Sequence, residues 1–229
     1  MATLLFVFYL LFFCFIIKKH AFFKNSGLPI YYLWVAFGIK VIAAIVYGCL
    51  HLYYYNGGDT LIFVEHSRYI YQVFYDNPLH FLSLTFCPTT DPPAPHLAAV
   101  AEQVNGWCDM RFYSMLRINA YIHFFSMGNY NIHAIFWAFL SFTGLVGIYR
   151  SFISYFPTSK LVLYLSIFCV PSIVFWGSGV HKEGLCYFLL GLSWYYFTAI
   201  QSHKKSIYYL FLIAALLGLL GIVRPHVLF

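Results

Sequence analysis

The chain has 229 residues, of which 62% are hydrophobic and 9% charged, and its formal net charge is +6. A soluble domain carries charge at roughly a quarter of its positions, so this composition excludes an ordinary water-soluble fold and predicts a lipid-embedded one. No basic cluster alternates with aromatic residues, as a nucleic-acid groove requires, and we expect no nucleic-acid partner.

Apolar stretches suited to membrane spans recur along the chain. The first, residues 2–17, has no basic segment before it and no small-residue cleavage site after it, so we interpret it as an uncleaved helix. The others cover residues 29–52, 131–149, 161–176, 184–200 and 207–223, each near the ~20 residues that cross a bilayer core. Period-2 alternation is absent, so we predict an all-α fold, a multi-pass transmembrane helical bundle of about six spans.

Charged residues sort by side if the spans are counted in this way. The segments on one side hold bases and no acid: Lys18, Lys19, Lys24, Arg150, Lys160, Lys204 and Lys205. The segments on the other side hold every acidic residue: Asp59, Glu65, Asp76, Asp91, Glu102, Asp109 and Glu183. Because cytoplasmic loops are enriched in Lys and Arg, we expect the N-terminus and the acidic face outside the cytoplasm, in a bacterial inner membrane.

Residues 53–130 form an extracytoplasmic loop too long for a simple connector, within a single integral membrane domain that covers residues 1–229. Apolar patterning predicts two interfacial helices in this loop, over residues 61–71 and 111–127, on either side of a proline-rich segment. Cys87 and Cys108 both lie in the loop, and an oxidising compartment would permit a disulfide between them.

The first polar motif is Gly57-Gly58-Asp59-Thr60, directly after the second span. Paired glycines allow a tight turn and the close approach of a ligand, and they leave the Asp59 carboxylate at the membrane surface. A carboxylate there can act as a general base toward a hydroxyl, or hold a divalent metal (Mg²⁺ or Mn²⁺) against phosphate. Alternatively, Asp59 caps the following helix. Glu65 and His66, further along that helix, are candidates to line the same site.

The second motif runs from Gly177 to Glu183 between two spans and contains His181 and Lys182. Three ionisable residues in one short turn are costly there unless they have a role. Lys182 and His181 are candidates to bind phosphate, and the helix that begins near Glu183 offers free N–H groups to an anion. The alternative is an interfacial loop in which Glu183 favours a helix N-terminus.

The third motif, Arg224-Pro225-His226, follows the last span on the same side. Arg224 is either a further phosphate ligand or an anchor at the membrane interface. Arg111 and Arg117 have the same two interpretations, and for them we favour the anchor.

Together these motifs resemble the GT-C superfamily of membrane glycosyltransferases, which use polyprenyl-phosphate-linked sugars. The resemblance rests on Gly57-Gly58-Asp59-Thr60, on the run from Pro171-Ser172 through Phe175-Trp176-Gly177-Ser178 to Lys182-Glu183, and on Arg224-Pro225. It implies that Asp59 is the catalytic base or a metal contact, and that Lys182 and Arg224 bind the lipid phosphate.

Two features depart from the family pattern. The carboxylate usually follows the first span of a chain whose N-terminus is inside, whereas Asp59 follows the second. Family members also have more spans, and the chain ends a few residues past a span, which suggests a truncated member.

The sequence therefore predicts a membrane protein that transfers a sugar from a polyprenyl-phosphate donor on the outer face, with membrane lipids and that donor as partners. One alternative is a polysaccharide transporter or polymerase component, which would use the same basic groups without Asp59 chemistry. Transporters favour internal repeats and broken helices, and the sequence indicates neither. The other alternative is a non-catalytic multi-pass membrane protein.

Overall fold

The computed structural model describes residues 1–86, 89–90, 93–201 and 206–227, and the regular structure in these ranges is helical. Three of the described helices are long and apolar enough to cross a membrane: α1 (Ala2–Lys19), α3 (Ile30–Tyr53) and α8 (Tyr130–Tyr155). The predicted all-α class is confirmed, and these three helices are compatible with a membrane protein.

The other helices are shorter. Those between α3 and α8 are α4 (Asp59–Asp76), α5 (Pro78–Phe86), the 3₁₀ helix η1 (Pro95–Leu97), α6 (Ala98–Gln103) and α7 (Met110–Ser126). The rest are α2 (Ala21–Lys24), α9 (Lys160–Phe168), α10 (Pro171–Trp176), α11 (Lys182–Ile200), α12 (Ser206–Val223) and the 3₁₀ helix η2 (Pro225–Val227). The two helices predicted within residues 53–130 correspond to α4 and α7.

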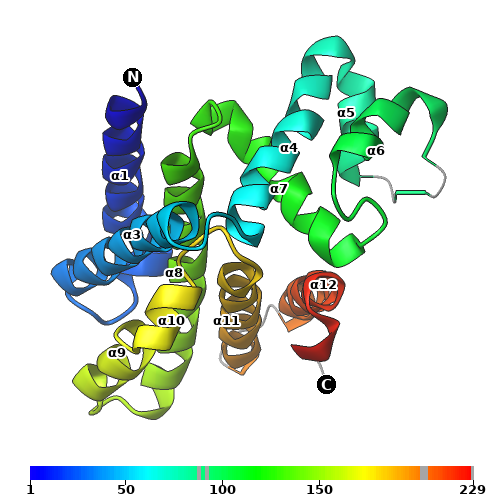
Figure 1. Cartoon of the computed structure of the whole chain (residues 1–229). Coiled ribbons are helices and arrows are strands. Elements are labelled where there is room, and N and C mark those ends of the chain that lie inside the picture. The colour runs from blue at the N-terminus through cyan, green and yellow to red at the C-terminus, as the bar shows by residue number, and fades with distance from the viewer. Residues whose placement is uncertain (87–88, 91–92, 202–205, 228–229) are drawn as a thin grey trace.

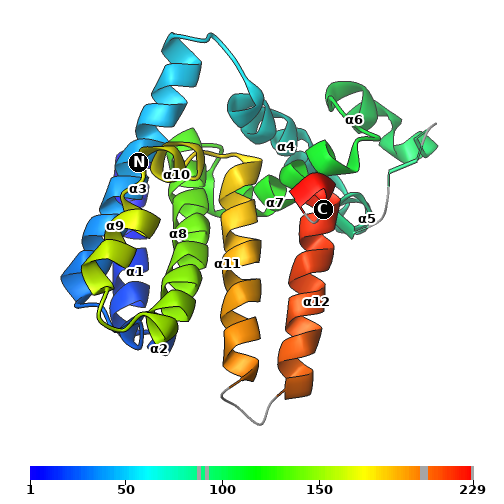
Figure 2. The same ribbon diagram turned by 90° about the horizontal axis from the view of Figure 1, so that it is seen from below.

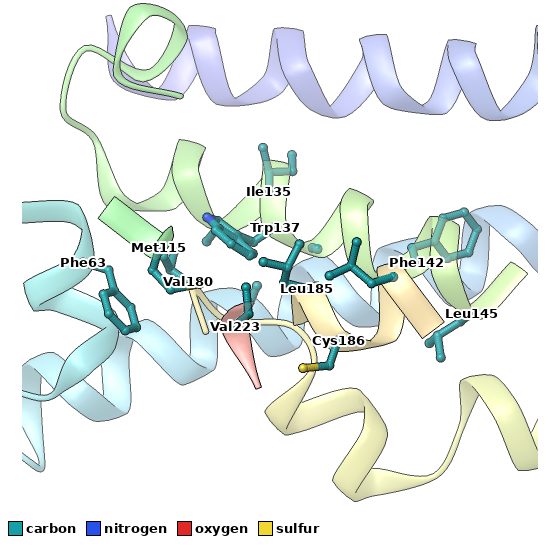
Figure 3. Packing of buried hydrophobic residues seen from close by; sticks show 14 of the residues in the cluster. Phe63, Met115, Ile135, Trp137, Phe142, Leu145, Val180, Leu185, Cys186 and Val223 are labelled. Carbon is teal, nitrogen blue, oxygen red and sulfur yellow. The ribbon is translucent and has the colours of Figure 1, made fainter. Parts of the chain in front are cut away.

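Helix α8 lies at the centre of the bundle. It packs against α1, α3, α7, α9 and α11, and its side chains Trp137, Phe142 and Leu145 are buried (Figure 3). The Asn129 side chain caps its start by accepting a hydrogen bond from the N–H of Asn131 at 3.0 Å, which satisfies one of the free donors of the first turn. Helix α8 therefore holds the surrounding helices in fixed positions relative to one another.

Glycines bring α8 and α11 into backbone contact. A methyl group placed on Gly191 would overlap the backbone of Gly144, and one placed on Gly144 would overlap the backbone of Tyr187. Gly147 faces Gly191 in the same way, with 2.7 Å between an added Cβ and the Gly191 carbonyl oxygen. Small residues at a crossing let helices approach closely in lipid. This contact fixes α11 against α8 and so fixes the position of Lys182, the first residue of α11.

The two ends of the bundle hold different elements (Figures 1 and 2). Helices α11 and α12 pack side by side, and the start of α11 and the end of α12 lie where α4 and α7 cross the bundle (Figure 2). Helix α2 and the end of α8 lie at the opposite end (Figure 2). We call the end with α4 and α7 the acidic end and the end with α2 the basic end.

Large apolar side chains face outward on the outer helices. Leu4 and Phe8 of α1 are 77% and 57% exposed, and Phe211 of α12 is 72% exposed. A soluble protein rarely exposes a contiguous apolar surface of this kind, whereas lipid tails are as apolar as these side chains. The exposed faces of α1 and α12 therefore favour contact with lipid.

The stretch that the sequence predicts as one span over residues 161–176 is divided into α9 and α10. Helix α9 ends at Phe168 and α10 begins at Pro171, because proline has no N–H and its ring clashes with the preceding turn. Lys40 of α3 lies against the second piece. Its side chain is 1% exposed, and Nζ donates a hydrogen bond to the Ile173 carbonyl oxygen at 3.4 Å. A continuous helix was the expectation, and Pro171 is the physical cause of the break.

Candidate functional site

Four helix ends meet at the acidic end: the N-termini of α4, α7 and α11 and the C-terminus of α12. Lys182, at the start of α11, lies close enough to the other three ends to interact electrostatically with Arg224, Asp109, Asp59 and Arg111. We call the group that these ends bring together the charged cluster: Asp59, Asp109, Arg111, His181, Lys182, Glu183 and Arg224. Its six charged side chains, with His181 neutral, sum to zero.

A tight turn presents Asp59. Gly57 and Gly58 have φ values of 150° and 126°, which L-residues with a Cβ rarely adopt. A Cβ on Gly58 would also lie 2.6 Å from the ring of His51. Asp59 is the first residue of α4 and is exposed. Gly58 occupies the N-cap and no side chain caps the helix, so the alternative in which Asp59 is the N-cap residue is not what the structure adopts.

One hydroxyl group ties the start of α4 to the loop before α11. The Tyr130 hydroxyl lies 2.7 Å from Thr60 Oγ1, and the backbone N–H of Val180 faces the same hydroxyl. Because this N–H faces the Tyr130 oxygen, the hydroxyl proton remains available for Thr60. Thr60 follows Asp59 and Val180 precedes His181, so Tyr130 sets the spacing between the two motifs.

Glu183 joins Arg224 and His181. Its Oε1 accepts from Nη2 of Arg224, and its Oε2 faces Nδ1 of His181. The side chains of Glu183, Arg224 and His181 are 32%, 27% and 18% exposed, so the arrangement is half-buried. From the sequence, Arg224 is predicted to bind a phosphate or to anchor the chain at the interface, and Glu183 is expected to support the site from the start of its helix. In the structure Arg224 is paired with Glu183, and Glu183 also faces His181, so Glu183 is the centre of this part of the cluster.

His181 is neutral at physiological pH. Burial lowers its pKa from 6.5 to about 4, and electrostatic interactions with Arg224, Lys182 and His51 act in the same direction, against Asp59. A neutral imidazole carries one proton, and Nδ1 faces a carboxylate oxygen of Glu183, so the proton lies on Nδ1. The Nε2 atom of His181 is then a hydrogen-bond acceptor, and the predicted contact of His181 with a phosphate stays a prediction.

The ammonium group of Lys182 has no ion-pair partner among the described residues. Its Nζ lies 5.7 Å and 5.8 Å from the ring centroids of Phe63 and Phe112, which hold the side chain by cation–π attraction. Within the described ranges neither Lys182 nor Asp59 forms an ion pair, whereas Arg224 is bound to Glu183. The cluster therefore contains one uncommitted cation and one uncommitted carboxylate, near enough to interact.

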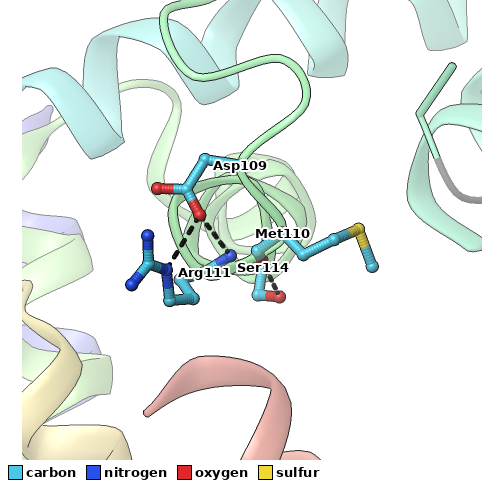
Figure 4. A network of polar contacts seen from close by, with 4 residues as sticks. All are labelled: Asp109, Met110, Arg111 and Ser114. Atoms are coloured by element: carbon cyan, nitrogen blue, oxygen red, sulfur yellow. Dashed lines mark hydrogen bonds and ion pairs between the residues drawn. The ribbon is translucent and has the colours of Figure 1, made fainter. Parts of the chain in front are cut away.

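Asp109 and Arg111 also belong to the cluster, although the sequence favoured a membrane anchor for Arg111 and assigned Asp109 no place in the site. Asp109 caps α7 by accepting from the Arg111 N–H at 3.0 Å, and it also accepts from Arg111 Nε at 3.2 Å (Figure 4). Burial alone would raise the pKa of Asp109, but the hydrogen bonds and charge of Arg111 outweigh it and lower that pKa. The signal that could have found the cap is an Asp directly before an apolar helix, whereas its proximity to Lys182 depends on how α7 packs.

A buried polar network holds α7 on α8. The Asn119 side-chain oxygen accepts from Trp137 Nε1 at 3.0 Å and from His133 Nδ1 at 2.9 Å. With its proton on Nδ1, His133 accepts at Nε2 from the Ser126 hydroxyl at 2.8 Å. These buried bonds join α7 to α8 at two points, so the N-terminus of α7 has a defined place at the acidic end.

Apolar packing supports the cluster from below. Phe63, Met115, Val180 and Val223 are buried and come from α4, α7, the loop before α11 and α12 (Figure 3). Val180 and Val223 directly precede His181 and Arg224 in the chain. Burial of each such side chain contributes roughly 1.5–3 kcal/mol to folding, so the packing of these neighbours helps to hold the charged groups in place.

Two of the predicted site residues lie apart from this group. His66 accepts a hydrogen bond at Nδ1 from the Asn105 N–H at 3.0 Å, a contact that fixes the segment before α7. Glu65 is exposed and lies six residues after Asp59 on α4, a spacing that turns it away from Asp59 on a helix of 3.6 residues per turn. The predicted disulfide involves Cys87, which lies outside the described residues.

Comparisons with family models, with curated proteins and with solved structures found no match. The resemblance to GT-C enzymes therefore stays a prediction that rests on the residues alone. In the part of the chain that the structure describes, no group of three or more His, Cys, Asp or Glu side chains could hold a metal ion. Mg²⁺ often binds one or two carboxylates together with substrate phosphates, so Asp59 alone would be the protein ligand, and this role too stays a prediction.

Proposed function

We propose that the chain transfers a sugar from a polyprenyl-phosphate donor to a hydroxyl group at the acidic end of the bundle. The observation that carries this proposal is the pair formed by Asp59 and Lys182: an exposed carboxylate and an ammonium group, each without an ion-pair partner among the described residues. Sugar transfer from a lipid phosphate needs a base for the acceptor and a cation for the departing phosphate. The uncommitted pair supplies one of each.

The proposed reaction is a displacement at the anomeric carbon. Asp59 takes the proton of the acceptor hydroxyl, the hydroxyl oxygen forms the new bond to the sugar, and the bond between sugar and phosphate oxygen breaks. The electron pair of that bond remains on the polyprenyl phosphate, whose added negative charge Lys182 neutralises. Arg224 and Glu183 position the turn that carries Lys182, and Arg224 adds a second positive charge nearby.

The membrane placement that goes with this proposal has six crossings. The three long apolar helices α1, α3 and α8 are joined by the broken segment α9–α10 and by α11 and α12, and the acidic end faces outward from the cytoplasm of a bacterial inner membrane. Support comes from the lysines of α1, α2 and α9, which belong to the basic end, because cytoplasmic segments are enriched in such residues.

The test is transfer by the full chain reconstituted in liposomes with a panel of radiolabelled polyprenyl-phosphate sugars. Asp59→Asn should lower the rate by about 10²–10⁴-fold, the usual contribution of a general base, without altering thermal stability. Asp76→Asn, at the exposed far end of the same helix, is the matched control and should leave the rate unchanged. Equal rates for Asp59→Asn and wild type would contradict the role given to Asp59.

The role of Lys182 is tested by measuring donor binding and the rate of transfer separately for two variants. Lys182→Met should weaken donor binding and slow transfer, because the phosphate charge loses its partner in both the ground and transition states. Lys182→Arg keeps the charge and should recover most of the lost activity. Full activity of Lys182→Met would contradict the assignment of the phosphate to this residue.

A second function is favoured by one specific observation, the buried Lys40 beside the break between α9 and α10. Broken helices and buried charges are features of transporters of lipid-linked or polyanionic glycans. In that case Lys40→Met would stop movement of a fluorescent polyprenyl-phosphate glycan across the bilayer, and Asp59→Asn would not. The two functions therefore make opposite predictions for the same pair of variants.

A further inference from the structure

The basic end contains two adjoining cavities that the proposed sugar transfer does not use. The first, of about 400 Å³, is lined by Lys18, Lys19 and Lys24 and by apolar side chains that include Leu28 and Leu33. The second, of about 500 Å³, lies between the starts of α3 and α9 and is lined by residues that include Leu28, Tyr32, Lys160 and Tyr164. Leu28 borders both cavities, so together they form one region, which we call the lysine groove.

The lysine groove carries positive charge without any counter-charge. Lys18, Lys19, Lys24 and Lys160 are exposed and form no ion pair within the described ranges. The sequence has no Asp or Glu in residues 1–58 or 110–182, which contain every element that lines the groove. A ligand of opposite charge is therefore the one that the groove attracts.

The walls of the groove are suited to a hydrocarbon chain. Leu33 and Phe23 are 0% and 3% exposed at its base, and Tyr164 is held by a hydrogen bond from its hydroxyl to the Tyr32 carbonyl oxygen at 3.1 Å. Aromatic rings at such a position are typical of the boundary between lipid head groups and acyl chains. A cluster of Lys above apolar walls thus matches a phosphate above an acyl chain.

From this match we propose that the lysine groove binds an anionic membrane phospholipid, with its phosphate at Lys18, Lys19 and Lys24 and an acyl chain along the half-buried Leu28 and Ile30. Basic pockets between transmembrane helices are suited to acidic head groups, because each Lys near the membrane surface adds to the attraction. This inference does not depend on sugar transfer, since it concerns the opposite end of the bundle. Failure of either proposal leaves the other unchanged.

The test is lipid retention by the full chain in native mass spectrometry, after incubation with equal amounts of phosphatidylglycerol and phosphatidylcholine. Wild type should retain phosphatidylglycerol in preference to phosphatidylcholine. A variant with Lys18→Gln, Lys19→Gln and Lys24→Gln should bind phosphatidylglycerol roughly 100-fold more weakly, from the loss of three charges near the membrane surface. The matching triple Arg variant keeps these charges and should retain the lipid. Equal retention of both lipids by wild type would overturn the proposal, as would undiminished phosphatidylglycerol binding by the triple Gln variant.

A second arm distinguishes a lipid from a free phosphate. Millimolar inorganic phosphate or glycerol phosphate should not displace the bound phosphatidylglycerol, because neither fills the apolar walls. Leu28→Asn should weaken lipid retention while the lysines remain in place. Displacement by inorganic phosphate, or unchanged retention by Leu28→Asn, would overturn the assignment of the groove to a phospholipid. In phosphatidylcholine nanodiscs, the midpoint of thermal unfolding should be the same for wild type and all these variants. A lower midpoint for the triple Gln variant alone would overturn the claim that the three lysines act only through the bound lipid.

Discussion

The two ends of the bundle both carry several bases but hold them in different ways. At the acidic end Arg224 is paired with Glu183, and both side chains are about one third exposed or less. At the basic end Lys18, Lys19 and Lys24 are exposed and unpaired within the described residues. Half-buried, paired charges have a defined geometry, whereas exposed like charges produce a field without fixed contacts. The acidic end is therefore suited to chemistry that depends on geometry, and the basic end to attraction of an anionic surface.

We expect the largest effect from a substitution that displaces side chains at the acidic end and leaves the basic end unchanged. Gly191→Ala adds a methyl group that overlaps the backbone of Gly144, and backbone cannot move aside as a side chain does. We expect a loss of about 3 kcal/mol or more in stability and displacement of Lys182 and Glu183, with lipid retention at the lysine groove preserved. Thermal unfolding in detergent measures the first effect and native mass spectrometry the second.

Gly218→Ala is the matched control for this change, because nothing lies within 4 Å of an added Cβ at Gly218 in α12. Alanine is the better helix former, so this variant should be as stable as wild type or slightly more stable. If Gly191→Ala and Gly218→Ala unfolded at the same temperature, the close contact of α8 and α11 would be wrong.

The next largest effect is a pH dependence that belongs to the acidic end. Burial lowers the pKa of His181 to about 4, with Arg224, Lys182 and His51 adding to the shift and Asp59 opposing it. As pH falls below the unfolded value near 6.5, the unfolded chain binds a proton before the folded chain does. The stability present above pH 6.5 is therefore lost as pH falls toward 4, by about 2 kcal/mol between pH 7.5 and pH 5.

His181→Gln should remove this part of the pH dependence. The measurement is the free energy of unfolding in urea for wild type and variant at pH 7.5 and pH 5, since other groups that titrate are common to both. The expected result is a smaller fall in stability for the variant. Equal falls would mean that His181 is not held neutral by its surroundings.

A smaller effect on stability is expected when one partner of the Glu183–Arg224 ion pair is removed, and almost none when an unpaired lysine of the basic end is replaced. Glu183→Gln leaves Arg224 without its carboxylate in a half-buried place, and we expect a loss of roughly 1–2 kcal/mol, between the values for exposed and buried pairs. Lys24→Met, at the exposed and unpaired basic end, should change stability by less than about 0.5 kcal/mol. A double-mutant cycle of Glu183→Gln with Arg224→Met measures the coupling, and a coupling of zero would contradict the pair.

The smallest effect concerns the spacing of the two motifs. Tyr130→Phe removes the hydroxyl that hydrogen-bonds to Thr60 beside the Val180 N–H, and the loss of this part-buried hydrogen bond should cost about 1 kcal/mol. Tyr155→Phe, which removes an exposed hydrogen bond to Gln201 at the basic end, should cost almost nothing. Thermal unfolding measures the loss of stability of each variant. Equal losses for the two variants would contradict the structural role given to the Tyr130 hydroxyl.

Composition and local patterns predict that the helices exist, but they predict only some of the residues at which the helices begin and end. The apolar stretches become α1, α3, α8, α11 and α12, because a helix satisfies its own backbone. The division at Pro171 was also open to prediction, since proline inside a helical stretch breaks it. Likewise, the helical period alone places Glu65 away from Asp59.

The arrangement within the charged cluster depends on tertiary packing and could not be predicted from spacing. Asp59 and Lys182 are more than a hundred residues apart in the chain, and they come close enough to interact electrostatically only through the packing of α4, α8 and the loop before α11, where Tyr130 contacts Thr60. The pairing of Glu183 with Arg224 follows from the contact of α11 with α12. The motifs indicate which residues are chemically capable, and the helix packing determines which of them are already committed to a partner.

The most direct test of the central claim is the side of the membrane on which each end lies. In a cysteine-free background, Asp59→Cys, Lys182→Cys and Lys24→Cys each provide one thiol for a membrane-impermeant reagent added to intact spheroplasts. Labelling of positions 59 and 182 in intact spheroplasts, and of position 24 only after permeabilisation, is the predicted result. Labelling of position 24 together with either of the others, or separation of 59 from 182, would contradict a reaction site built at one face opposite the lysines.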